Sequence, residues 1–157
     1  MNSLLAIDPG QTKSGVCAVS DWTLPRPVAI TGEWDNDFLL NRIAQYELVV
    51  IERCANYGCE VGQELFDTIL WAGRFVQARL AAGCSFPILI DRPTIKLRLL
   101  GKRNGKDSQL RAALIDRYGP SKEQAVGTKK NPGPLYGVSG SHEWAALAVA
   151  VAYQIGE

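Results

Sequence analysis

The sequence predicts one α/β domain, in which a mixed β-sheet carries helices on its faces. Short apolar runs that end in an acidic residue or a Gly-rich turn alternate with segments of helical periodicity. The first three runs are joined by connections too short for crossover helices, which favours an antiparallel meander. A chain of 157 residues is long enough for one well-packed domain and too short for two of ordinary size, so residues 1–157 should form a single unit.

The chain up to residue 91 contains the predicted sheet. Apolar runs bounded by turn residues predict five strands, at 3–8, 16–20, 27–34, 47–54 and 86–91. Apolar residues at helical spacing predict helices at 36–46 and 62–82, and Gly83 is a natural C-cap for the second. The apolar face of that longer helix consists of Leu65, Ile69, Ala72, Val76 and Leu80.

The rest of the chain is basic at first and apolar at its end. It comprises a basic segment, a predicted helix, a Pro-, Gly- and Lys-rich loop and a final helix, at 92–101, 106–119, 127–140 and 140–153. Small apolar residues fill the last helix, which should pack closely on the sheet. It nevertheless begins with Ser141 as the expected N-cap, His142 as the only histidine of the chain, and Glu143.

Composition excludes several classes of protein. A hydrophobic content of 46% with 21% charged residues is typical of a globular chain and not of a disordered one. No apolar run approaches the roughly 20 residues of a membrane span, and the start lacks a signal-peptide pattern, so we expect a cytoplasmic protein that does not enter membranes. The four cysteines show no zinc or disulfide spacing, and we expect all of them to be reduced.

Charge is divided unevenly along the chain. Residues 92–130 carry eleven Lys and Arg against three Asp and Glu, whereas residues 1–91 carry six against eleven. A charge run alone is usually a solvated face, but an acidic part joined to a basic part also suits a cluster of carboxylates beside a cationic binding surface.

Two acidic residues close predicted strands that lie far apart in the chain. Asp8 ends the first strand, directly before a Pro-Gly turn, and Glu52 ends the fourth. If these strands are parallel neighbours, both carboxylates emerge at the same edge of the sheet. Carboxylates in such a place suit Mg²⁺ or Mn²⁺. Two such ions, about 3.5–4 Å apart, can activate water and stabilise a leaving oxygen in phosphodiester hydrolysis.

The turn after Asp8 is ambiguous by itself. A strand, an Asp and a Gly turn also occur in sugar-kinase and actin-like ATPases, but those folds need two related domains and a longer chain. Taken with "LVVIERC" and "SHEWAALAVAVAY", however, "LLAIDPGQTKSGVCAV" resembles RuvC-type Holliday-junction resolvases over most of the chain. The likeness is greatest to short, divergent phage or prophage members, and "IDPG", "VVIE" and "HE-W-AALAVA" carry it.

The resemblance implies an RNase H-like fold and a homodimer that cuts branched DNA, Holliday junctions above all, with divalent metal. It assigns Asp8 and Glu52 as metal-binding acids, and Lys96 as a basic residue near the junction backbone. In such families the last helix carries two acidic or His/Asp positions three residues apart, which share a helix face. Here they fall on His142 and Ala145, and Ala145 cannot bind metal.

The sequence leaves open which group replaces the missing ligand. Glu143 is our first expectation, because it stands in the first turn beside His142. Asp107 is an alternative; it falls where the family tends to carry a lysine, which Lys106 could replace. A third possibility is a site short of one ligand and therefore weak or inactive. For His142 we expect a role in binding metal or in positioning or deprotonating the attacking water.

We expect the basic part of the chain to contact the DNA backbone, because Lys–phosphate contacts release counterions. The expected contacts are Lys96, Lys102, Arg103, Lys106, Lys129 and Lys130. Tyr57 stands in the loop after Glu52, where it could stack on bases at a branch point or pack in the core. The helix at 62–82 is the expected dimer contact.

Three functions are therefore consistent with the sequence. The first is a metal-dependent, structure-specific endonuclease acting on four-way junctions. The second, motivated by Ala145, is a weak or inactive module that binds junctions or other DNA on the same fold. The third is a nuclease for RNA or for branched DNA in general.

Overall fold

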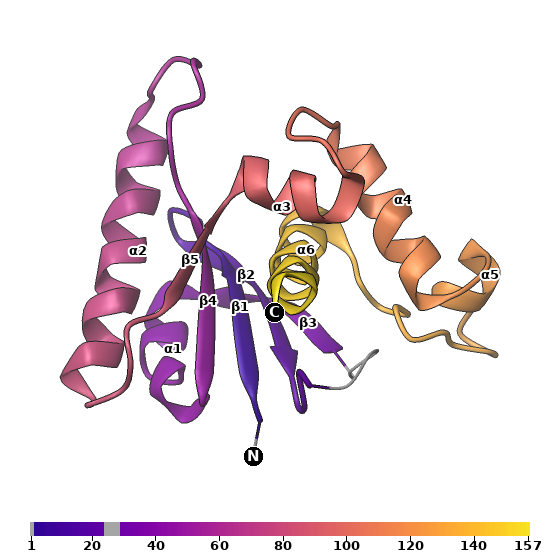
Figure 1. The fold of residues 1–157 in the computed structure, drawn as a ribbon. Helices are drawn as coiled ribbons and strands as arrows, with labels where there is room; N and C mark the ends of the chain where they lie inside the picture. The colour runs from indigo at the N-terminus through magenta and orange to yellow at the C-terminus, as the bar shows by residue number, and fades with distance from the viewer. Residues whose placement is uncertain (1, 24–28) are drawn as a thin grey trace.

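A five-stranded mixed sheet forms the centre of the computed structural model, which describes residues 2–23 and 29–157 (Figure 1). The strand order is β3-β2-β1-β4-β5, and the strands are β1 Leu4–Asp8, β2 Lys13–Val19, β3 Ala29–Asp35, β4 Leu48–Arg53 and β5 Ile88–Asp91. The strand predicted at 27–34 thus corresponds to β3, and its first two residues lie outside the described part of the chain.

Strand pairing confirms the predicted sheet. The strands β1, β2 and β3 form an antiparallel meander, whereas β1 pairs with β4 and β4 with β5 in parallel. In this register Ile7 lies beside Ile51, so the next residue of each strand, Asp8 and Glu52, emerges at the same edge. The carboxyl ends of the three parallel strands therefore meet at one end of the molecule.

Helices cover both faces of the sheet, as Figure 1 shows. One face carries α1 Asn36–Leu40, the 3₁₀ turn η1 Ile43–Gln45 and α2 Gln63–Ala81. The other carries α3 Arg92–Leu100, α4 Asp107–Tyr118, α5 Lys122–Ala125 and α6 Gly140–Gly156. The helix predicted at 36–46 is divided into α1 and η1, and the basic segment at 92–101 forms α3, whose N-cap Asp91 accepts a hydrogen bond from the Thr94 amide at 2.8 Å.

The Ala-rich helix α6 lies directly on the sheet, as its sequence predicts. Every residue from Trp144 to Tyr153 is buried. Small side chains permit this close approach, and glycine on the sheet extends it: a Cβ on Gly15 of β2 would collide with the carbonyl oxygen of His142. Because Gly15 is paired with Asp8, the first turn of α6 is held next to the end of β1.

Helix α2 packs on the sheet through only part of the predicted face: Val76 contacts the core, and Leu65 and Ala72 are half-buried. Ile69 and Leu80 of the predicted apolar face are 45% and 43% exposed, whereas Phe75 is fully buried against the sheet. The predicted face was therefore only partly correct, because apolar residues surround much of this helix and periodicity alone did not select the buried side. Apolar side chains, including Phe66 at 58% and Leu70 at 65% exposure, are left on its outer surface.

A buried arginine anchors the end of α2. Arg79, only 1% exposed, donates hydrogen bonds to the backbone carbonyl oxygens of Ile43, Tyr46, Glu47 and Ser85, at 2.8–3.2 Å. It therefore ties α2 to the loops before β4 and β5 through backbone acceptors. All four cysteines are free thiols, as predicted, and none of the helices in the described ranges is long and apolar enough to cross a bilayer.

Candidate active site

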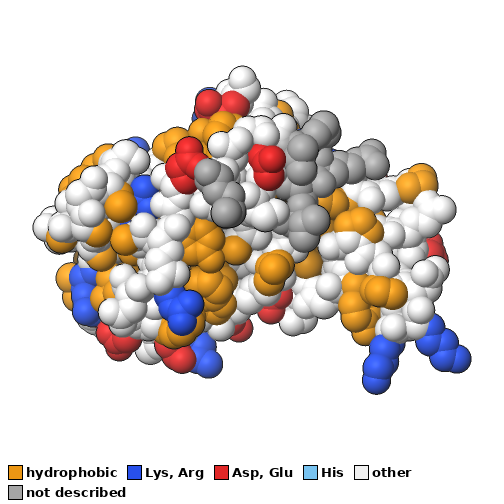
Figure 2. Space-filling model, turned by 90° about the horizontal axis from the view of Figure 1, so that it is seen from below, with side chains coloured by type: hydrophobic (Ala, Val, Ile, Leu, Met, Phe, Trp, Pro, Cys, Tyr) orange, Lys and Arg blue, Asp and Glu red, His pale blue; other side chains and the backbone are white. Residues whose placement is uncertain are grey.

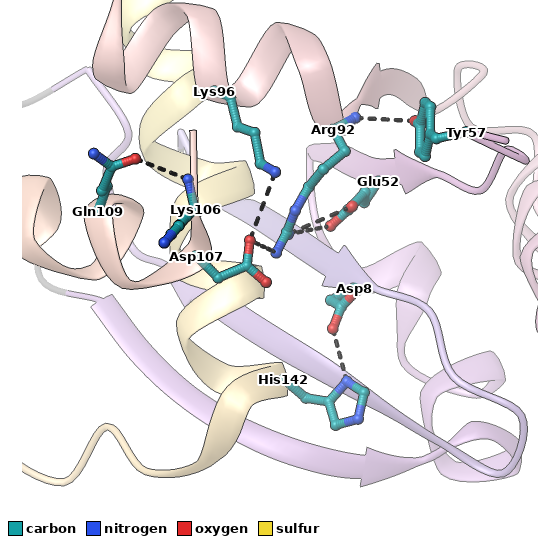
Figure 3. Close-up of polar contacts among 9 residues, drawn as sticks. All are labelled: Asp8, Glu52, Tyr57, Arg92, Lys96, Lys106, Asp107, Gln109 and His142. Atoms are coloured by element: carbon teal, nitrogen blue, oxygen red, sulfur yellow. Dashed lines mark hydrogen bonds and ion pairs between the residues drawn. The ribbon is translucent and has the colours of Figure 1, made fainter. Parts of the chain in front are cut away.

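The two strand-closing acids stand together at the carboxyl edge of β1 and β4 (Figure 3). Their side chains are mostly buried, with 17% exposure for Asp8 and 14% for Glu52. Burial raises the pKa of Glu52 to about 7, and the negative charge of Asp8 adds to this rise while Arg92 opposes it. Burial also raises the pKa of Asp8, against the opposing effect of its hydrogen bond with His142. Burial is thus the main cause of both shifts, and the charge of Asp8 acts on Glu52 in addition.

The turn after Asp8 is braced by a buried hydrogen-bond network. The Ser14 hydroxyl accepts from the Gly10 amide at 3.2 Å and donates to Asn36 Oδ1 at 2.6 Å. Asn36 Nδ2 in turn donates to the Gly10 carbonyl oxygen at 2.9 Å. Since Ser14 and Asn36 are both buried, this network holds the "PGQTK" turn in one geometry and with it the end of β1.

His142 joins the site from the first turn of α6. Its Nδ1 lies 2.8 Å from Asp8 Oδ2, so the carboxylate orients the ring through that nitrogen. The side chain is 50% exposed, and the remaining ring nitrogen, Nε2, is not used in that contact. The structure thus brings Asp8, Glu52 and His142 together, as the sequence analysis expected.

A cation lies against the second acid. Arg92 Nη1 is 3.2 Å from Glu52 Oε2, and its Nη2 is 2.9 Å from Asp107 Oδ1. Lys96, one turn further along α3, lies 3.9 Å from the same Asp107 oxygen. Asp107 therefore contacts the cluster formed by Asp8, Glu52 and His142 only through basic residues, as Figure 3 shows.

Glu143 is turned to other partners. Its carboxylate accepts hydrogen bonds from the Thr31 hydroxyl at 2.7 Å and from the Ser139 hydroxyl and amide at 3.1 and 3.3 Å. Ser139, and not Ser141, is the N-cap of α6. Glu143 thus ties the start of α6 to β3, and the structure does not bring it to Asp8 and Glu52.

Ala145 borders a cavity beside the acidic cluster. The cavity, of about 380 Å³, lies between α4 and α6 and is lined at its polar end by Arg92, Asp107 and Ser141. Trp144 and Arg111 also line it, and the Arg111 guanidinium lies 4.6 Å from the centre of the Trp144 ring. No acidic side chain from α6 fills the space next to Ala145.

The expected DNA-contact residues fall into two groups. Lys96 and Tyr57 lie at the cluster, since the Tyr57 hydroxyl accepts from the Arg92 amide at 3.3 Å and its side chain is 53% exposed. The others are exposed, in the turn between α3 and α4 or in the loop after α5: Lys102, Arg103, Lys106, Lys129 and Lys130. Figure 2 shows the molecule from below, where the Lys and Arg side chains are scattered and form no single patch.

The donor chemistry of Asp8 and Glu52 fits a hard divalent ion. Mg²⁺ is commonly held by one or two carboxylates, with water and substrate phosphate as its other ligands, and Asp8 and Glu52 can supply such a pair. His142 adds a nitrogen next to Asp8. Within residues 2–23 and 29–157, no three or more His, Cys, Asp or Glu side chains are arranged as a ready-made metal cluster. The residues therefore fit an ion that also needs ligands from water and substrate.

Arg92 is the site residue that the sequence analysis missed. It was counted there only as one charge of the basic segment. Its position was nevertheless a usable signal, because it directly follows β5, which runs parallel to β4. A residue at that point must emerge at the same sheet edge as Asp8 and Glu52.

Comparison with known proteins adds the decisive observation on the fold. No protein-family model matches the sequence, and no curated protein does. Solved structures do match over nearly the whole chain. One is Thermus thermophilus RuvC, with a TM-score of 0.65, 17% identity and coverage of 98% of this chain and 93% of that one. The chain has a RuvC-type fold.

The second match concerns a RuvC with its substrate. It is T. thermophilus RuvC in complex with a Holliday junction, with a TM-score of 0.68, 19% identity and coverage of 99% of this chain and 94% of that one. The expected RuvC-type, RNase H-like architecture of a mixed five-stranded sheet flanked by helices is thus confirmed. At this identity the likeness concerns the fold.

Proposed function

We propose that this chain is a metal-dependent, structure-specific DNA endonuclease that hydrolyses phosphodiester bonds at four-way junctions. The observation that carries the proposal is the meeting of Asp8, Glu52 and His142 at one sheet edge of a RuvC-type fold. The RuvC structure with a Holliday junction supports the choice of branched DNA as substrate. The uneven charge of the chain supports a polyanionic partner.

Each residue of the cluster has a proposed task. Asp8 and Glu52 bind Mg²⁺ or Mn²⁺, which when bound supplies Lewis-acid activation of water and stabilisation of the leaving oxygen. Asp8 also fixes the His142 ring through Nδ1, so that Nε2 is available to accept a proton from the attacking water. The buried Ser14 network keeps Asp8 in position for both tasks.

The basic residues and Tyr57 are proposed to hold the DNA. We assign Lys96, which lies near Arg92 and Asp107, to the DNA backbone near the cleaved bond, and the two exposed basic segments to the backbone further away. The half-exposed Tyr57 ring lies beside the Arg92 backbone, where it can stack on an unpaired base.

We also propose a homodimer formed through α2. The exposed apolar side chains on this helix, among them Phe66 and Leu70, support the interface, and a two-fold enzyme suits a two-fold junction. Light scattering coupled to size exclusion tests this directly. The Phe66→Glu and Leu70→Glu double variant should elute as a monomer, and a monomeric wild-type chain would contradict the proposal.

The experiment that tests the activity is a substrate panel with Mg²⁺ or Mn²⁺. We expect cleavage of four-way junctions above flaps, Y-forks and RNA–DNA hybrids, and loss of cleavage with Asp8→Asn. The exposed Glu60→Gln variant is the control. Preferential cleavage of hybrids or flaps would instead favour a nuclease for RNA or for branched DNA in general.

Ala145 favours a second candidate, a weak or inactive junction-binding module on the same fold. This reading predicts salt-sensitive junction binding that Asp8→Asn does not impair. If the wild-type chain leaves junctions intact while Ala145→Asp cuts them, the module is the better description. If the wild-type chain cuts them, the endonuclease proposal stands.

A further inference from the structure

The acidic cluster already contains a cation that belongs to the chain. The Arg92 guanidinium bridges two carboxylates, at 3.2 Å from Glu52 and 2.9 Å from Asp107, and its side chain is only 20% exposed. The bridge is mostly shielded from water on the Glu52 side, where the carboxylate is 14% exposed. A charged contact in this environment is far less screened than one on an open surface.

The backbone holds Arg92 in this place from two sides. It is the first residue of α3, and the Asp91 carboxylate caps that helix through the Thr94 amide at 2.8 Å. Tyr57, from the loop after β4, accepts the Arg92 amide hydrogen at 3.3 Å. The guanidinium therefore starts from a fixed point at the sheet edge and is directed across Glu52 (Figure 3).

Among the described residues, the carboxylate that lines the cavity between α4 and α6 is that of Asp107, and it is already paired with Arg92. Ala145 offers no ligand atom, and the Glu143 carboxylate is occupied by Thr31 and Ser139. Arg92 and Asp107 line the cavity that Ala145 borders. The guanidinium of Arg92 therefore supplies the positive charge on that side of the site, and the Asp107 carboxylate is its ion-pair partner. A second divalent ion would also meet a like charge, because Arg92 is within 3.2 Å of Glu52.

We infer that Arg92 takes the place of the second divalent ion in this cluster, so that each chain binds one ion. The inference rests on the proposed function for the identity of the site and replaces the two ions expected from the sequence. The single ion uses Asp8 and Glu52 with water or phosphate oxygens. Asp107 serves to hold the guanidinium and is not a metal ligand.

Counting bound Mn²⁺ tests this without reference to cleavage. Free Mn²⁺ is measured by electron paramagnetic resonance as it is titrated into the intact protein, with isothermal titration calorimetry as a second measurement. The wild-type chain should bind one ion. Arg92→Gln removes the competing charge and should tighten Mn²⁺ binding at least about tenfold. The Arg92→Gln and Ala145→Asp double variant should bind two ions.

Two variants serve as controls. Arg111→Gln removes an arginine from the same cavity that lies on Trp144 and not on a carboxylate, so it should bind Mn²⁺ as the wild type does. Arg92→Lys keeps the charge and should also bind one ion. If circular dichroism shows that Arg92→Gln is unfolded, the number of Mn²⁺ ions bound by the Ala145→Asp single variant tests the inference. That variant should still bind one ion, because Arg92 is present.

The outcomes separate this inference from the proposed function. Zero or two ions in the wild-type chain, or unchanged Mn²⁺ affinity in folded Arg92→Gln, would overturn the inference even if junctions are cleaved. One ion with tighter binding in Arg92→Gln supports it even if the chain cleaves no junction, in which case the endonuclease proposal fails alone.

Discussion

The buried carboxylate of Glu52 should make the stability of the fold depend on pH. Burial raises the pKa of this group to about 7, from an ordinary value of 4.5. Between these values the folded chain holds a proton that the unfolded chain has lost. The free energy of unfolding should therefore fall as the pH rises from about 4.5 to about 7, and the loss should be complete above that range.

The magnitude follows from the same pKa. Each pKa unit corresponds to about 1.4 kcal/mol, so ionising Glu52 in the folded state costs up to about 3 kcal/mol. Asp8 contributes in the same direction, because burial raises its pKa too. Glu52→Gln removes the ionisation and keeps a side chain of similar size, so most of the pH dependence should disappear and the variant should be more stable than the wild type at pH 8.

Urea unfolding followed by circular dichroism, in the presence of EDTA, measures the free energy of unfolding of the wild type and of Glu52→Gln at each pH between 5 and 8. Glu60→Gln changes an exposed carboxylate in the loop after β4 and is the matched control. The reasoning would be refuted by a Glu52→Gln variant whose stability changes with pH as steeply as that of the wild type. A Glu52→Gln chain less stable than the wild type at pH 8 would show that the Arg92 contact outweighs the burial of the charge.

Three further predictions concern the scaffold and the DNA surface. Ser14→Ala should lower the free energy of unfolding by about 1–3 kcal/mol in urea titrations, because it leaves buried Asn36 and a turn amide without their partner; an unchanged midpoint would argue against the network. Arg79→Leu should cost about 3 kcal/mol or more by the same assay, since four backbone carbonyls lose a charged donor, and a loss under 1 kcal/mol would contradict this anchoring role. Changing Lys102 and Arg103 to Gln should reduce the slope of log binding constant against log salt by about 2 on four-way junctions, whereas an equal slope would place this turn away from the phosphates.

The sheet and its two acids could be predicted because their signals are local. Apolar runs that end in Asp8 and Glu52 define strand ends. Short connections indicate antiparallel pairing, whereas connections that contain a helix indicate parallel pairing. Once the pairing is known, the pleat and register place both carboxylates at one edge. The Ala-rich body of α6 likewise predicted close packing on the sheet, which the short distance between Gly15 and the His142 carbonyl oxygen confirms.

Partner choice among polar side chains could not be predicted in this way. Glu143 stands next to His142 in the sequence, yet its carboxylate binds Thr31 and Ser139 because the phase of α6 turns it towards β3. A long side chain has many possible partners within its reach, and only the positions of distant elements select one. The same reason applies to α2, where the periodic pattern indicated a helix but not the face that meets the sheet.

The sequence by itself determined that Asp8 and Glu52 close neighbouring strands and that a small-residue helix starting near His142 packs on them. Only the tertiary structure decided what fills the rest of the site. It brings Arg92 from the end of β5 between Glu52 and Asp107, and leaves Ala145 facing a cavity. Strand and helix signals arise from neighbours in the chain, whereas the charge balance of a site arises from side chains that meet only after the sheet has formed.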